Sequence, residues 1–260
     1  YMTDVMAVTA SVSGGAVGLS GGGIDVNNSI ANIIAAHAGG LTTLTADGDV
    51  AITAGENAYL AADVTSVSVS VSLGAALGVA LVENQIGSSV QAWVEDASVY
   101  ADNIRISAAS TADIAKTISA GISASAVGVQ GNEATAIINT LAKAFVEDAE
   151  LNAAGDVVIE ATADNQANSS SLGGAFGAIA VGAMVADVSM GRGTGIDEVV
   201  ASVGDESIIS ARSLRITAGS TDDLLAESLA GGGGAIAAAG AQSNVYSDYA
   251  TLARIGADAV

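Results

Sequence analysis

The feature that most constrains this chain is an internal repeat, because a chain that repeats at a fixed period folds as an array of similar units. An octet of the type Ala-Gly-Asp-Val-x-Ile-x-Ala occurs four times. Its isoleucines are Ile52, Ile106, Ile159 and Ile216, which are 54, 53 and 57 residues apart. A second element recurs between the octets, and its valine or isoleucine is Val94, Val146, Val203 or Ile255. We expect these eight residues to form the repeating core.

The array divides without linkers or shifts in composition. Its units are roughly 1–56, 57–110, 111–163, 164–220 and a truncated 221–260. We therefore expect a single continuous segment over residues 1–260 rather than a set of domains. The last unit stops before its octet, so we also expect the chain to be a fragment of a much longer one.

Within a unit the hydrophobic period is two. The stretch from Val67 to Leu73 alternates valine or leucine with serine, and Asp47-Gly48 and similar pairs supply turns. Proline is absent, as expected where every backbone N–H is needed in a ladder. These features predict an all-β fold, namely a β-solenoid (parallel β-helix) of imperfect repeats, with two or three coils in each repeat. Helices in the Ala-rich stretches are disfavoured, because each interior glycine costs a helix about 1 kcal/mol.

Composition excludes several classes of protein. Seven Lys and Arg stand against 28 Asp and Glu, a net charge of -21, which excludes a nucleic-acid partner. A hydrophobic content of 50% excludes disorder, and the lack of cysteine excludes disulfides. The longest apolar run, Leu172 to Ala186, is short of the roughly 20 residues that a spanning helix needs, so we expect no membrane span.

No catalytic constellation is present. The only histidine, His37, aligns with Trp93 and Phe145 of later units and has no triad or metal partner. Aromatic residues make up 3% of the chain, too few to build sugar-binding platforms beside paired carboxylates. We expect no enzyme, and a polysaccharide-active β-helix enzyme is the most distant alternative.

Acidic turn residues are the only candidates for binding a cofactor, which would be calcium. Calcium takes several oxygen ligands, but the sequence has neither an EF-hand loop nor the nonapeptide pattern of calcium-binding β-rolls. We therefore expect no metal and no cofactor, and we interpret these carboxylates as solvated turn residues. The weak calcium candidates are Asp47, Asp49, Asp96 and Asp148.

Two further patterns recur with the units. An Asx residue follows each run of small residues, and we expect it at a tight corner, because Asn tolerates the left-handed conformation. These residues are Asn28, Asn84, Asn132, Asp187 and Asn244. The Gly/Ala runs have two interpretations: they line a flat, narrow interior, or they form a silk-like face that packs on neighbouring molecules. On the second interpretation, self-association uses Ala175, Ala178 and Ala180.

The cycle of a Gly/Ala-rich strand, an Asn, Ala-x-Val-x-Asp-Ala and Ala-Gly-Asp-Val-x-Ile-x-Ala resembles the repeats of giant bacterial surface proteins. These include filamentous-haemagglutinin-like adhesins and fusobacterial leukotoxin-like repeat proteins. The resemblance covers essentially the whole chain and implies a secreted or cell-surface β-solenoid. We expect an extracellular structural fibre or stalk that associates with itself, end to end or laterally. The alternative is a spacer in a large secreted adhesin, whose cell-surface or polysaccharide target is bound by other parts of the chain.

Overall fold

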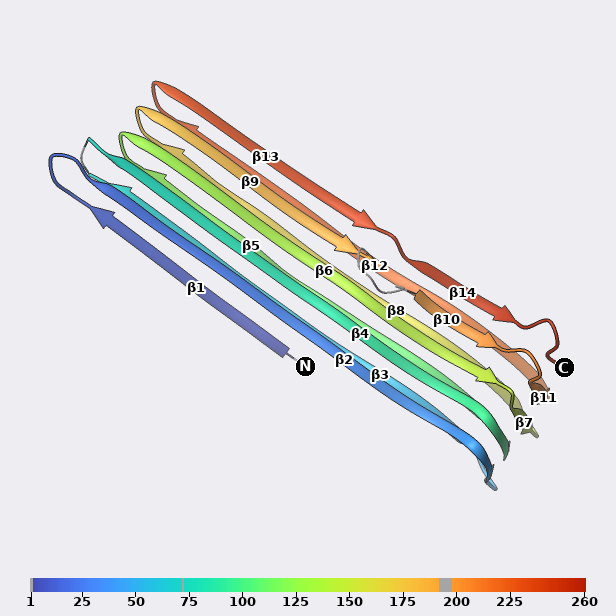
Figure 1. Cartoon of the computed structure of the whole chain (residues 1–260). Coiled ribbons are helices and arrows are strands. Elements are labelled where there is room, and N and C mark those ends of the chain that lie inside the picture. The colour runs from blue at the N-terminus through green and yellow to red at the C-terminus, as the bar shows by residue number, and fades with distance from the viewer. Residues whose placement is uncertain (1, 72, 192–197) are drawn as a thin grey trace.

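The protein folds into two stacked β-sheets (Figure 1). The computed structural model describes residues 2–71, 73–191 and 198–260, and these form strands and turns with no helix among them. Sheet A contains, in spatial order, β1 (Met2–Ser13), β3 (Val50–Ser70), β5 (Ile104–Ala124), β8 (Asp156–Phe176) and β12 (Ser213–Gly233). The prediction of an all-β fold is confirmed.

Sheet B takes the intervening strands. They are β2 (Leu19–Thr45), β4 (Ala75–Ala101), β6 (Val127–Glu147), β7 (Glu150–Ala153), β9 (Ile179–Met190), β10 (Glu198–Val203), β11 (Ile208–Ser210), β13 (Ile236–Ser247) and β14 (Ala250–Ile255). The chain therefore alternates between the sheets. We call one strand of sheet A, together with the sheet B strands that follow it, a rung. The five rungs are β1–β2, β3–β4, β5–β7, β8–β11 and β12–β14.

Successive rungs pair in parallel. Met2 pairs with Tyr59 in sheet A, and Ala75 pairs with Val127 in sheet B, at separations of 57 and 52 residues. One rung therefore uses the length of one sequence unit, and the expected two or three coils per unit are wrong. The reason is that the strands do not break at the Ser- and Gly-rich stretches, so β3 runs for 21 residues and β4 for 27.

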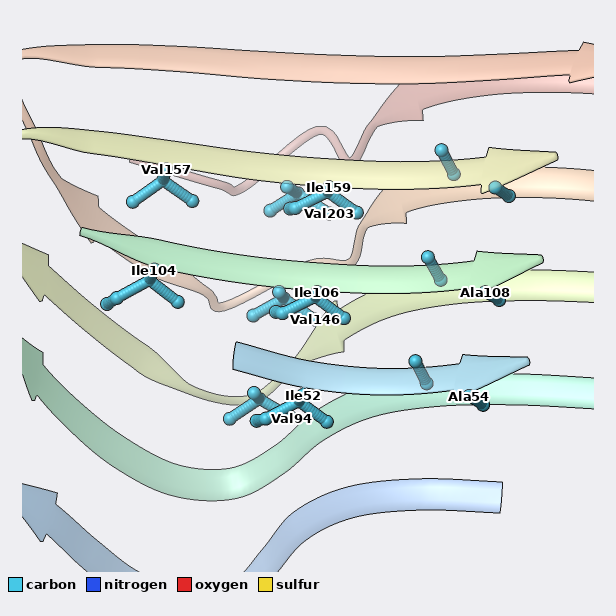
Figure 2. Close-up of a cluster of buried hydrophobic side chains, with 14 of the residues drawn as sticks. Ile52, Ala54, Val94, Ile104, Ile106, Ala108, Val146, Val157, Ile159 and Val203 are labelled. Carbon is cyan, nitrogen blue, oxygen red and sulfur yellow. The ribbon is translucent and has the colours of Figure 1, made fainter. Parts of the chain in front are cut away.

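The octet isoleucines and the valines of the second element face each other between the sheets. In sheet A, Ile52 pairs with Ile106, which pairs with Ile159. Figure 2 shows these three isoleucines one above another, with Val94, Val146 and Val203 beside them. All six are buried. Ile216 and Ile255 continue the two ladders into the last rung, where Ile216 is partly buried and Ile255 is 59% exposed.

Each rung joins a charged end to a charge-free end. The charge-free end comprises residues 5–24, 64–82, 117–132, 165–186 and 228–247, which contain no Asp, Glu, Lys or Arg. It holds the turns from sheet A to sheet B, which lie at the upper left of Figure 1. The opposite, charged end holds the isoleucine and valine ladders.

Candidate functional site

The charge-free end buries its serines and carries many of its large apolar side chains on the outside, while Val64, Val82 and Met184 point inward. In β3, Ser66 and Ser68 are buried between the sheets, whereas Val67 and Val69 alternate with them on the outer face. The Val-Ser alternation predicted a strand with one buried face. The structure shows that the buried face is the serine face.

A β-bulge in β5 produces the same inversion in the next rung. The register against β3 shifts between Ile114 and Lys116, which adds one residue to β5. Since side chains alternate with period two, one added residue exchanges the inner and outer faces of the rest of the strand. Ile106 is therefore fully buried at the charged end, whereas Ile122 is 48% exposed at the charge-free end.

Serine hydroxyls close the interior of the charge-free end. Ser68 Oγ donates to the carbonyl oxygen of Leu77 at 2.9 Å, and Ser119 Oγ donates to that of Ala80 at 2.6 Å. Ser171 Oγ donates likewise to Asn132 O at 3.1 Å. Each bond joins sheet A to sheet B. The buried hydroxyls that form them satisfy their donors without water.

Inward-facing glycines let the two sheets approach closely at this end. A Cβ added at Gly173 would lie 2.5 Å from the carbonyl oxygen of Gly121, and one at Gly128 would lie 2.7 Å from that of Phe176. Neither site has room for a side chain. This agrees with the interpretation that the Gly/Ala runs line a narrow interior.

The expected self-association residues do not share one surface. Ala175 is 0% exposed and Ala180 is 1% exposed, and both face the interior, while Ala178 lies exposed in the turn between β8 and β9. The predicted contact surface of these three residues is therefore wrong, because two of them have no accessible side chain. The exposed neighbours are instead Phe176 and Ile179.

None of the expected corner residues lies at a corner. Asn28, Asn84, Asn132, Asp187 and Asn244 all lie within strands. Buried Asn84 accepts a hydrogen bond from Asn28 Nδ2 at 2.9 Å. Its own Nδ2 donates to Lys116 O at 3.0 Å and to Thr117 Oγ1 at 2.9 Å. The side chain therefore holds the β5 bulge from the opposite sheet, a role that a single strand's pattern does not reveal.

The remaining three members hold other positions. Asn132 is also buried and donates through Nδ2 to Leu172 O at 2.6 Å. It pairs with Ala80 rather than with Asn84, so the two asparagines are not equivalent in the sheet. Asn244 Nδ2 donates to Asp187 Oδ1 at 2.5 Å, which joins β13 to β9.

The left-handed positions fall on a different set of residues. The non-glycine residues with positive φ in the described chain are Leu41, Asp96, Asp148 and Glu206. Asp96 and Asp148, at φ 50° and 48°, are two of the weak calcium candidates and follow the Val-Glu motif of their units. They lie along one open groove at the charged end, together with Glu206. Asp tolerates this conformation, which gives these two residues a backbone role.

The acidic residues of the described chain do not gather into a metal site. In the residues covered by the structure, no group of three or more His, Asp or Glu side chains is placed to hold a metal ion. Asp49 accepts a hydrogen bond from Asn103 Nδ2 at 2.7 Å, and the sheet A strand that follows it begins one residue later. Asp47 lies near it in the turn between β2 and β3.

An aromatic ladder runs across the outer face of sheet B at the charged end. His37 stacks on Trp93 with ring centroids 4.5 Å apart, and Trp93 stacks on Phe145 at 5.7 Å. The Lys143 ammonium group lies 4.1 Å from the Phe145 ring centroid. Their alignment in the sequence repeat thus becomes direct stacking, as parallel in-register pairing requires.

In the part of the chain that the structure describes, three ion pairs join neighbouring rungs along sheet A: Arg105–Glu160 at 2.5 Å, Lys116–Asp63 at 2.8 Å and, just before β12, Arg212–Asp156 at 3.0 Å. The hydrogen bond from Lys116 to Asp63 raises the pKa of Lys116. Hydrogen bonds from Ser213 and then Arg212 lower the pKa of Asp156. Burial, followed by repulsion from Asp164, raises the pKa of Asp113.

Comparison with protein-family models, curated proteins and solved structures finds no match. Within residues 2–71, 73–191 and 198–260, no helix has the length and apolar character needed to cross a membrane.

Proposed function

We propose that this chain is a segment of an extracellular structural fibre, built as a β-solenoid with one rung per repeat of about 54 residues. The observation that carries the proposal is the register. Each strand of sheet A, and each long strand of sheet B, pairs in parallel with the corresponding strand of the next rung. Such pairing adds similar layers along one axis.

The dimensions of a rung favour a fibre over a spacer. Each rung extends the stack by only about 4.8 Å, the spacing between hydrogen-bonded strands. The 27 residues of β4 span about 90 Å across the stack at 3.3 Å per residue. The chain thus forms a wide, thin ribbon that gains surface much faster than length. An adhesin spacer, the alternative function, would need length above all.

We expect association along the axis rather than across it. The outer strands of both sheets, β1 and β12 in sheet A and β2 and β13 in sheet B, each have one neighbour in the structure. Unpaired parallel edges accept further strands of the same kind. The inward position of Ala175 and Ala180 removes the main argument for lateral packing through the Gly/Ala runs.

The extracellular location rests on the resemblance of the repeats to those of bacterial surface proteins. The high acidity and the absence of cysteine agree with such a location. We propose no catalytic role. For the acidic residues of the groove we propose a structural role, namely to adopt the positive φ that the bends require.

Cryo-electron microscopy at rising protein concentration tests the fibre. The proposal expects ribbons that lengthen with concentration, with about 4.8 Å spacing along the long axis and a width near 90 Å. EDTA should leave them intact, because the residues that the structure describes form no group placed to hold a metal ion. Particles that keep the size of a single chain at every concentration would contradict the proposal, and dissolution by EDTA would restore calcium as a cross-linker.

A further inference from the structure

We propose that the charge-free end inserts into the hydrocarbon region of a lipid layer with zwitterionic headgroups, while the charged end stays in water. The inference goes beyond the fibre function. It depends on the fibre function in one respect only. The first and last rungs have unpaired edge strands, and in a fibre further rungs would pair with those edges.

The first argument is that this end is apolar on both outer faces. In the inner rungs, sheet A exposes Ile122 (48%) and Phe176 (46%), and sheet B exposes Leu77 (51%) and Val181 (44%). The turns that join the two faces are also uncharged, and they carry Ser125, Ala126, Gly177 and Ala178. A flat partner would cover one face only, whereas lipid surrounds both faces and the turns.

The second argument is depth. Between Asp63 and the turn, β3 contributes seven uncharged residues, 64–70, and β4 contributes eight, 75–82, before Glu83. Seven to eight strand residues at 3.3 Å each span about 23–26 Å. The hydrocarbon core of a bilayer is about 30 Å thick. In this rung the charge-free end is therefore long enough to enter that core and short enough to end inside it.

The third argument is that most buried polar groups of this end are paired within the protein, the exceptions being Ser13 Oγ, Ser123 Oγ and Gln130 Oε1. Lipid cannot satisfy backbone or hydroxyl groups, so such groups must be paired internally. The backbones of the inner rungs are paired on both sides within the sheets. The hydroxyls of Ser68, Ser119, Ser169 and Ser171 donate to carbonyl oxygens between the sheets.

Charge favours a lipid layer over a second copy of this chain as the partner of the charge-free end. Acids border the charge-free end on both faces: Glu227 and Asp63, which is paired with Lys116, on sheet A, and Glu83, Glu133 and Asp187 on sheet B. Stacking one copy on another would bring these acids together in a chain of net charge -21. A zwitterionic surface imposes no such repulsion, and an anionic one does.

Vesicle flotation tests the proposal. We expect the protein to float with phosphatidylcholine vesicles, and to float less with vesicles rich in phosphatidylserine at low salt. A variant with Ile122→Asp and Val181→Asp, one change on each face, should lose flotation by at least tenfold. Its matched control, Thr53→Asp with Ser89→Asp, adds the same charge to both faces of the charged end and should float like the wild type. Circular dichroism of both variants checks that the β-structure persists.

Depth-dependent quenching supplies a second measurement that does not depend on the charged variants. Trp93, the only tryptophan, lies at the charged end, so brominated phosphatidylcholine should leave the fluorescence of the wild type unchanged. In the variant with Trp93→Phe and Ile122→Trp, the same vesicles should quench the emission strongly. Failure to float, or quenching of Trp93 with none at position 122, would overturn the proposal.

A second copy as the occupant would give a different result. The protein would then form particles in the absence of vesicles, and the Ile122→Asp and Val181→Asp variant would dissociate them without a change in flotation. That outcome would also overturn the lipid proposal. Ribbon growth along the axis, seen by microscopy, reports on the fibre function alone, so the two proposals can fail separately.

Discussion

The two ends of each rung use opposite chemistry in their interiors. At the charged end, isoleucine and valine ladders fill the space between the sheets, and Ile106 and Val146 are fully buried. At the charge-free end, serines and glycines occupy much of it beside a few apolar residues such as Val64 and Met184, and Ile122 and Val181 face outward. Both ends keep parallel pairing, and the β5 bulge shifts its register between them.

The comparison shows that an alternating pattern predicts a strand but does not predict which of its two faces points into the protein. Apolar residues point inward only where the space between the sheets is wide enough for them. Where glycine and serine bring the sheets close together, larger residues such as Ile122 and Val181 face outward. The consequence is a molecule with an ordinary core at one end and an exposed apolar surface at the other.

The largest expected effect comes from shortening one isoleucine side chain to alanine at each end of β5. Ile106→Ala should lower the free energy of unfolding by about 2–5 kcal/mol, because it leaves a cavity in a fully buried ladder. Ile122→Ala, on the same strand but on the outer face, should cost less than about 1 kcal/mol. Urea unfolding followed by circular dichroism measures both. Equal losses would show that the outer face of the charge-free end is packed against something in solution.

A second pair tests the narrowness of the charge-free end. Gly173→Ala should destabilise the protein by about 1–3 kcal/mol, because the new methyl would meet the Gly121 carbonyl oxygen. Gly131→Ala faces open space, with nothing within 4 Å of an added Cβ, and should be neutral or slightly stabilising. Thermal unfolding of the two variants gives the comparison. A neutral Gly173→Ala would mean that the sheets separate easily at this end.

The sequence was sufficient for the all-β class and for the core ladders, because both depend on patterns within one strand and on the repeat. Ile52 and Ile106 occupy equivalent octet positions, and parallel pairing places them side by side. The number of coils per unit could not be obtained in this way. It depends on whether strands stop at Ser- and Gly-rich stretches, and here they continue, with buried serines such as Ser119 bonded to the opposite sheet.

The roles of individual polar residues were the least predictable part. Asn84 was expected at a corner because of its type, yet it holds a bulge on the opposite sheet. The left-handed bends fall instead on Asp96 and Asp148. The signal available for them was their common place after Val-Glu in two units, read together with the tolerance of Asp for positive φ.

A third pair separates the two kinds of buried serine at the charge-free end. Ser119→Ala should cost about 1 kcal/mol, since it removes a hydrogen bond of 2.6 Å to the Ala80 carbonyl oxygen. Ser123 is equally buried on the same strand, but its hydroxyl has no partner among the residues that the structure describes. Ser123→Ala should therefore be neutral or stabilising. Denaturant titration should give Ser119→Ala the lower free energy of unfolding of the two variants. The reverse order would contradict the hydrogen bonding described for this interior.

The smallest effect is expected at Asp113, which lies on β5 at the limit of the charged end. Its pKa is raised by burial and by Asp164, so the ionised form destabilises the folded state. For an acid with a raised folded pKa, this penalty is complete above the folded value and absent below the unfolded value. Asp113→Asn should thus stabilise the protein at pH 7, and the gain should vanish near pH 3, below the ordinary carboxyl pKa of about 3.9.

Asp63→Asn provides the opposite control on the neighbouring strand. Asp63 pairs with Lys116 at 2.8 Å, and both groups are partly exposed, so its loss should cost at most about 1 kcal/mol at pH 7. Urea unfolding of the wild type and the two variants at pH 7 and pH 3 shows whether each substitution raises or lowers the free energy of unfolding. If Asp113→Asn destabilised the protein at pH 7, the carboxylate would have a stabilising partner. The charged end would then continue past Asp113 as a paired network, instead of ending in a strained carboxylate where the apolar surface begins.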